Sequence, residues 1–77
     1  MKYTFAGKVQ GVGFRHTARQ IATELNLKGY VRNQEDGTVE LTVYGHTASI
    51  KTLIDTLTTT FKVVSKEIPN APNFEIL

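Results

Sequence analysis

The 77 residues are enough for one domain, and a chain of this length buries only about 60% of the surface that it exposes when unfolded. Hydrophobic residues make up 40% and charged residues 21% of the sequence, which is typical of a soluble globular protein, and the absence of cysteine excludes disulfides, thiolate metal clusters and a thiol nucleophile. The formal net charge of +2 comes from scattered residues without a block of like charges, so the composition favours a small anion over a nucleic acid as ligand.

The first third of the chain predicts a strand followed by a helix. In residues 2–9 one set of positions alternates with the other, as in a strand with one covered face: Tyr3, Phe5, Gly7 and Val9 on one side, and Lys2, Thr4, Ala6 and Lys8 on the other. Residues 14–25 place apolar side chains on one side of a helix, at Ala18, Ile21, Ala22 and Leu25. Glycines at positions 11 and 13 separate the two elements.

The middle of the chain predicts a hairpin. A second strand over residues 30–33 leads to Asp36 and Gly37, a pair that strongly indicates a turn. In the third strand, residues 38–44, the apolar side chains again share one face, and Gly45 ends the strand.

A second helix is predicted to begin with Thr47 or Ser49 as its N-cap and to carry one apolar stripe as far as Phe61. Residues 63–68 indicate a fourth strand, residues 69–72 a turn and residues 74–77 a short terminal strand. The order is β-α-β-β-α-β plus the short strand. It predicts one α+β domain over residues 1–77, a ferredoxin-like two-layer sandwich with an antiparallel sheet.

The loop between the first strand and the first helix, with the sequence GKVQGVGFR, is a candidate phosphate site. Glycine lets a backbone approach a ligand closely, and the free N–H groups at a helix start favour an anion. Arg15 has the wrong sign for the first turn of a helix, which a bound anion would explain. The alternative is a tight turn followed by a solvated arginine.

Asn33 strengthens the phosphate hypothesis. In a split β-α-β unit the first and second strands are parallel, so Arg15 and Asn33 are expected to face one crevice. An amide that donates and accepts hydrogen bonds could hold a water in line behind the phosphorus. Taken alone, Asn33 is equally natural as a turn residue. His16 is expected to face outward, because successive helical residues point about 100° apart.

Three segments in the right order resemble the acylphosphatase family: VQGVGFR at 9–15, GYVRN at 29–33 and DGTVELTVYG at 36–45. The resemblance implies that Arg15 binds the substrate phosphate and that Asn33 positions the attacking water. It further implies that the phosphate is held by the backbone amides of Gln10, Gly11, Val12, Gly13 and Phe14. Gln34 stands where many members of the family carry a threonine.

The expected activity is hydrolysis of the carboxylic-phosphoric anhydride of small acyl phosphates to a carboxylate and inorganic phosphate. The leaving carboxylate needs no general acid. No cofactor or metal is expected, since His16 and His46 lie on different elements and the acidic residues are scattered. Residues 1–11 lack a signal-like apolar stretch. We therefore expect a cytoplasmic monomer that meets acyl phosphate and phosphate, but neither nucleic acid nor membrane.

Three alternatives remain at this point. An RNA-binding module would stack bases on Tyr3, Phe5 and Tyr44, although alternation assigns Tyr3 and Phe5 to the core side. The chain could also be a carbamoyl-phosphate-processing relative, or a member that binds phosphate without turning anything over. Tyr30 and Tyr44 are expected to serve in packing.

Overall fold

The computed structural model describes residues 1–10 and 13–68 of the chain. Its elements are β1 (Lys2–Ala6), α1 (Phe14–Glu24), β2 (Lys28–Asn33), β3 (Val39–Tyr44), α2 (Thr47–Phe61) and β4 (Val64–Ile68). This order confirms the predicted β-α-β-β-α-β arrangement. The predicted turn at residues 69–72 and the predicted terminal strand at residues 74–77 lie outside the described residues, so the extent of the domain over residues 1–77 stays a prediction.

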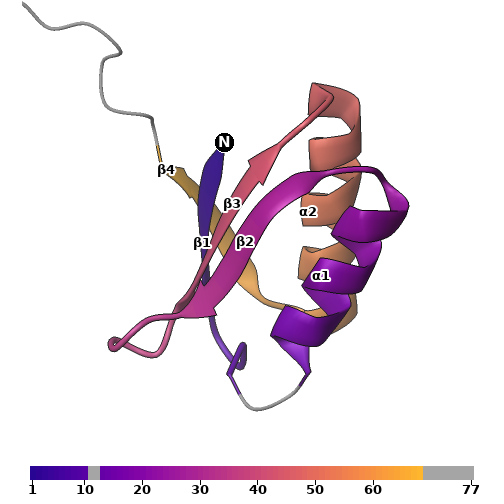
Figure 1. Cartoon of the computed structure of the whole chain (residues 1–77). Helices are drawn as coiled ribbons and strands as arrows, with labels where there is room; N and C mark the ends of the chain where they lie inside the picture. Colours follow the sequence, from indigo (N-terminus) through magenta and orange to yellow (C-terminus); the bar gives the residue numbers. More distant parts are fainter. Residues whose placement is uncertain (11–12, 69–77) are drawn as a thin grey trace, which may run out of the picture.

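The four strands form one sheet in the order β2-β3-β1-β4, and every neighbouring pair is antiparallel. Because β3 lies between β1 and β2, these two strands are parallel to each other, as the sequence predicted. Both helices cover the same face of the sheet (Figure 1), and no helix of the described residues covers the opposite face, called the open face below. The fold is therefore the expected ferredoxin-like α+β sandwich.

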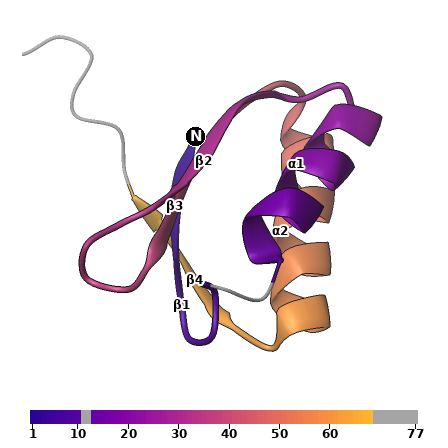
Figure 2. The same ribbon diagram turned by 60° about the horizontal axis from the view of Figure 1, so that its bottom comes forward.

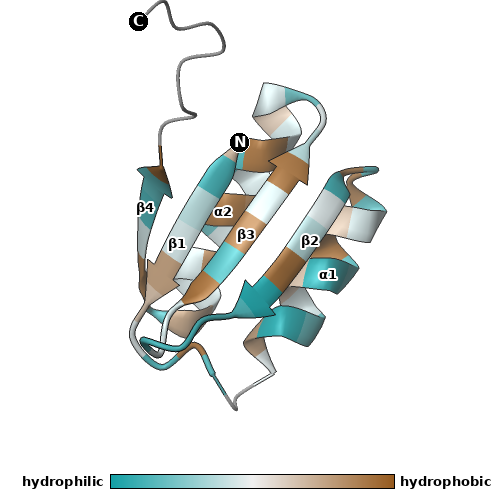
Figure 3. Cartoon of the chain, turned by 60° about the vertical axis from the view of Figure 1, so that its left-hand side comes forward, coloured by the Kyte–Doolittle hydropathy of each residue, from teal (hydrophilic) through white to brown (hydrophobic). Residues whose placement is uncertain are grey.

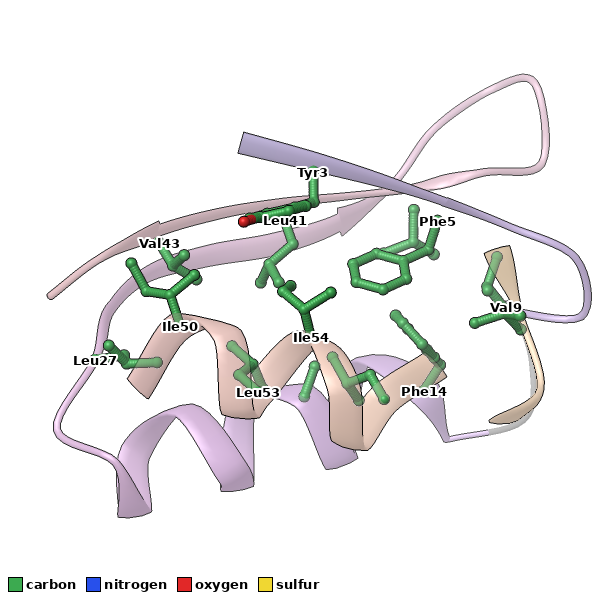
Figure 4. Packing of buried hydrophobic residues seen from close by; sticks show 14 residues of the cluster. Tyr3, Phe5, Val9, Phe14, Leu27, Leu41, Val43, Ile50, Leu53 and Ile54 are labelled. Carbon is green, nitrogen blue, oxygen red and sulfur yellow. The ribbon is translucent and has the colours of Figure 1, made fainter. Parts of the chain in front are cut away.

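The core lies between the sheet and the two helices. The alternation of β1 places Tyr3 and Phe5 on the helix side, and Val39, Leu41 and Val43 lie beside them from β3. In Figure 4 these side chains meet those of α2. Burial of Tyr3 and Phe5 keeps two of the three aromatic rings of the RNA-binding alternative from stacking on a base, whereas the third, Tyr44, is exposed.

The boundaries of α1, α2, β3 and β4 agree with the prediction to within one residue, and those of β1 and β2 differ by more. β1 ends at Ala6, three residues early, because Gly7 turns the chain with a φ of +116°. β2 begins at Lys28, two residues early, because Gly29 continues the strand with a φ of +140°. α2 begins at Thr47, as predicted, but neither Thr47 nor Ser49 is its N-cap. The cap is His46, which has an extended backbone and makes no side-chain capping bond.

The packing role predicted for Tyr30 and Tyr44 was wrong. Both lie on the open face of the sheet, with 48% and 63% of their surface exposed. Figure 3 shows this face in front of the helices. The guanidinium of Arg32 lies over the ring of Tyr30, with its central carbon 5.7 Å from the ring centroid. The face of the sheet away from the helices therefore carries two exposed aromatic rings.

Candidate active site

The loop between β1 and α1 is anchored in the core at both of its ends. Val9 and Phe14 are each only 1% exposed, although the residues that follow each of them are exposed. The Phe14 ring lies 5.0 Å from the Phe5 ring and 5.0 Å from the Phe61 ring, measured between centroids. The predicted phosphate-binding residues thus stand between two fixed points, and of these residues Gly11 and Val12 lie outside the described part of the chain.

Gly13 ends the loop and begins α1. It adopts the left-handed conformation, with φ +77° and ψ 9°, which few residues other than glycine take without strain. Its carbonyl oxygen accepts the first helical hydrogen bond, from the N–H of Thr17 at 3.0 Å. No side chain caps this terminus and its first turn carries no acidic residue. The first N–H groups of α1 therefore remain free for an anion.

The missing cap does not by itself single out α1, because α2 begins with an uncapped His46 and also lacks an acidic residue in its first turn. Arg15 is what distinguishes α1. Its side chain is exposed, and it makes no ion pair with a described residue. A guanidinium without a protein partner at the positive end of a helix is the arrangement expected when the partner is a ligand anion.

Asn33 is the last residue of β2 and is exposed. It pairs with Val39, whose side chain is in the core, so Asn33 lies on the helix side of the sheet. The end of β2 and the beginning of α1 lie at the same end of the molecule (Figures 1 and 2). The two element ends that carry Asn33 and Arg15 thus lie at one end of the sandwich, and the crevice that the two side chains were expected to share stays a prediction.

A cavity of about 370 Å³ lies between α1 and β2, with Ala18, Thr23 and Tyr30 among its lining residues. Its lining includes neither Arg15 nor Asn33, so this cavity is not the predicted phosphate site.

Sequence reasoning missed the side chain of Gln10. Its amide nitrogen donates hydrogen bonds to the carbonyl oxygens of Gln34, at 3.1 Å, and Thr38, at 2.9 Å. These acceptors lie 24 and 28 residues away along the chain. Periodicity reports only which face a residue occupies, so no local pattern in the sequence could reveal this contact.

Gln34 is well held, although it replaces the threonine that many family members carry. Its side-chain amide donates to a carboxylate oxygen of Glu40 at 3.3 Å, and its side-chain oxygen accepts a bond from the Thr38 hydroxyl at 2.7 Å. Its backbone N–H donates to the carbonyl oxygen of Thr38 at 2.8 Å. The turn beside Asn33 is therefore fixed through both backbone and side chain.

Glu40 is a buried carboxylate on the otherwise open face of the sheet, only 3% exposed. Arg32 lies 2.8 Å from one of its oxygens and Lys2 lies 3.4 Å from the other. The hydrogen bond from Arg32, followed by the positive charges of Arg32 and Lys2, holds the pKa of Glu40 below the usual range of a glutamate. Because Arg32 and Gln34 flank Asn33, this carboxylate binds both chain neighbours of the predicted catalytic amide.

The histidines take no part in a cluster. His16 is exposed on α1, as expected from its position next to Arg15, and His46 lies before α2. Within residues 1–10 and 13–68, no three histidine, aspartate or glutamate side chains are grouped closely enough to hold a metal ion. Independence from metal stays a prediction, which only assays can test.

The chain is an α+β protein of the ferredoxin-like class. Its first strand leads through a loop with glycines at positions 7 and 13 into a helix without a side-chain cap. The acylphosphatase family model matches residues 1–71. The acylphosphatase of Hahella chejuensis is 48% identical over 52 residues, which cover 68% of this chain and 55% of that protein. The acylphosphatase of Methanospirillum hungatei is 46% identical over 55 residues, which cover 71% of this chain and 60% of that protein.

Solved structures agree with these matches. The chain is similar to an acylphosphatase from Coxiella burnetii, with a TM-score of 0.72 and 38% identity, over 88% of this chain and 78% of that one. It is also similar to the acylphosphatase from Bacillus subtilis, with a TM-score of 0.70 and 26% identity, over 90% of this chain and 88% of that one. The chain belongs to the acylphosphatase family. Its matches to the curated relatives span somewhat more than half of their length.

Proposed function

We propose that this chain hydrolyses the carboxylic-phosphoric anhydride of small acyl phosphates, releasing a carboxylate and inorganic phosphate. Membership of the acylphosphatase family supports the activity. One observation carries the assignment of the site: Arg15, without a protein partner among the described residues, stands in the first turn of an uncapped helix, at the same end of the sandwich as Asn33. An anion is the ligand that such an arrangement attracts.

The chemistry requires few groups. The conjugate acid of the leaving carboxylate has a pKa near ~4, so the carboxylate departs without being protonated. The phosphoryl-transfer transition state spreads negative charge over the equatorial oxygens, and catalysis consists of placing donors around them and a water in line. The fork of Arg15 would take two oxygens, while the loop amides from Gln10 to Phe14 take the others. Asn33 would orient the attacking water.

The test is hydrolysis of an aryl acyl phosphate such as benzoyl phosphate, measured with a chelator present. We expect turnover by the parent, and a loss of about 10²–10³ in rate for Asn33→Ala, by analogy with removal of an oxyanion-hole donor. Arg15→Ala should lose at least as much rate and should bind inorganic phosphate more weakly. Arg19→Ala, an exposed arginine one turn further along α1, is the matched control and should retain the parent rate.

Parent-like turnover by Asn33→Ala would contradict the role of Asn33. Turnover that disappears with the chelator would contradict metal independence. Binding of phosphate by a parent that hydrolyses nothing would favour the non-enzymatic alternative. This last result separates an enzyme from a family member that only binds phosphate.

The remaining assignments are proposals of the same kind. We infer a cytoplasmic monomer whose ligands are acyl phosphate and phosphate and which binds neither nucleic acid nor membrane. Among the described residues, no helix has both the length and the apolar character to cross a membrane. Sedimentation of the purified protein would test the monomer, and a gel shift with single-stranded RNA should give no complex.

A further inference from the structure

The side chain of Gln10 joins two parts of the protein that meet only at the candidate site. Its amide nitrogen carries two hydrogens, and each finds one backbone carbonyl oxygen, on Gln34 and on Thr38. Both partners can only accept, so the nitrogen and not the oxygen of the Gln10 amide must face them. The contact therefore fixes the orientation of the whole amide.

Within the described part of the loop, Gln10 provides the side-chain hydrogen bonds to the rest of the protein. Val9 and Phe14 anchor the two ends by burial, which fixes where the loop starts and stops. Burial of the ends does not set how far the backbone N–H of Gln10 stands from β2. The Gln10 contact sets this distance, because its acceptors lie in the turn that directly follows Asn33.

The hairpin side of the contact has hydrogen bonds of its own. The single hydroxyl hydrogen of Thr38 has Asp36 and Gln34 as alternative acceptors, and the side-chain amide of Gln34 donates to the buried Glu40. Glu40 in turn holds Arg32, on the other side of Asn33. A chain of hydrogen bonds thus runs from the loop through the turn to both neighbours of Asn33.

We propose that Gln10 is a positioning residue, whose side chain sets the distance and angle between its own backbone N–H and Asn33. The inference rests on the proposed function, since it assigns the alignment of that site. It goes beyond the backbone role expected for Gln10, because the side chain points to the hairpin and not to the ligand. Phosphate and water would then be held in line by one shared support.

Loss of the Gln10 side chain should lower the rate of the reaction more than the stability of the fold. Gln10 is exposed and its side chain fills no part of the core, so its loss should leave the folded state nearly as stable. An in-line reaction depends steeply on alignment, and a misplacement of about 1 Å can cost about 10²-fold in rate. We therefore expect a fall of about tenfold or more in kcat, with little change in the midpoint of thermal unfolding.

The experiment compares the parent with Gln10→Met and Gln10→Glu in hydrolysis of benzoyl phosphate. Methionine keeps the length of the side chain without a donor, and ionised glutamate keeps its shape while turning acceptors toward two carbonyl oxygens. We expect both variants to lose kcat about tenfold or more, with Gln10→Glu lower. Gln20→Met, an exposed glutamine of α1, is the control and should match the parent.

The inhibition constant of inorganic phosphate gives a second readout. Because Arg15 remains, Gln10→Met should bind phosphate within a few-fold of the parent while kcat falls, a split that general loosening of the fold would not produce. A kcat of Gln10→Met or Gln10→Glu within twofold of the parent overturns the inference. A loss of kcat that merely follows a lowered unfolding midpoint overturns it as well.

Failure of this inference can be distinguished from failure of the proposed function. If the parent hydrolyses benzoyl phosphate, Arg15→Ala does not, and Gln10→Met behaves as the parent does, only the role of the Gln10 side chain is wrong. If the parent is inactive, or if Arg15→Ala matches an active parent, the proposed site fails and the inference fails with it.

Discussion

At Gly29 the absence of a side chain decides whether two strands can pair. Its φ is +140°, and a Cβ atom built there would overlap the carbonyl oxygen of Thr42 on β3. The neighbouring atoms of β3 are backbone, which cannot move aside as a flexible side chain would. The early start of β2 therefore depends on this glycine.

We predict that Gly29→Ala lowers the free energy of unfolding by more than about 2 kcal/mol, because strain and steric overlap add. Gly37→Ala is the matched control: its φ is +89°, but nothing lies within 4 Å of the position of the new Cβ. It should cost about 1 kcal/mol, from backbone conformation alone. Urea unfolding followed by circular dichroism measures both, and equal losses would show that the steric contact with β3 is unimportant.

Single residues also mark the limit of what the sequence predicts. Arg15 and Asn33 could be proposed from their places in short segments, because a loop rich in glycine and the end of a strand are local features. The side chain of Gln10 could not, since its acceptors are 24 and 28 residues distant. Nor could the cap at His46, because Thr47 and Ser49 are better capping residues and only the geometry of the chain excludes them.

At the scale of elements, the carboxylate of Glu40 ties β1, β2 and β3 together through Lys2 and Arg32. Alternation places Glu40 on the face away from the helices, which in a strand with one covered face is the face left to solvent. Long side chains from the neighbouring strands cover it instead. Burial on an open face depends on cross-strand partners, which alternation within one strand does not report.

A fall in pH should weaken the ion pairs of Glu40 with Lys2 and Arg32. Because the pKa of Glu40 is lowered in the folded state, its contribution to stability is fully present above the pKa of the unfolded chain, about 4.3, and is lost as the pH falls through the lower folded value. We predict that Glu40→Gln lowers the free energy of unfolding by about 1–3 kcal/mol at pH 7. The difference from the parent should shrink as the pH falls below about 4.3, and it should vanish once the pH is below the lowered pKa of Glu40 in the folded protein, where the parent carboxyl is protonated too.

Urea unfolding of both proteins at a series of pH values measures this difference. Glu35→Gln, at an exposed position of the same hairpin, is the control and should follow the parent within about 0.5 kcal/mol at every pH. A difference between Glu40→Gln and the parent that stays constant down to pH 2 would show that ionisation of Glu40 does not support the fold.

At the scale of the whole molecule, the strand order and the helix face followed from the sequence. Two amphipathic helices and a sheet with one apolar face leave few ways to bury all three surfaces, and the β-α-β-β-α-β order selects one of them. The core places Phe14 between Phe5 of β1 and Phe61 of α2. The residue that begins α1 thus joins both layers, which connects the packing of the molecule to the position of its loop.

The central claim is that one phosphate binds where β1 passes into α1, held by Arg15 and backbone amides. The most direct test is a titration of the ¹⁵N-labelled protein with inorganic phosphate, followed by the amide resonances of Gln10, Gly13 and Phe14. We predict that these resonances shift together with one dissociation constant, and that Arg15→Ala weakens the binding about tenfold or more, as loss of a charge-assisted pair would. Shifts confined to other residues, or an unchanged dissociation constant in Arg15→Ala, would contradict the claim.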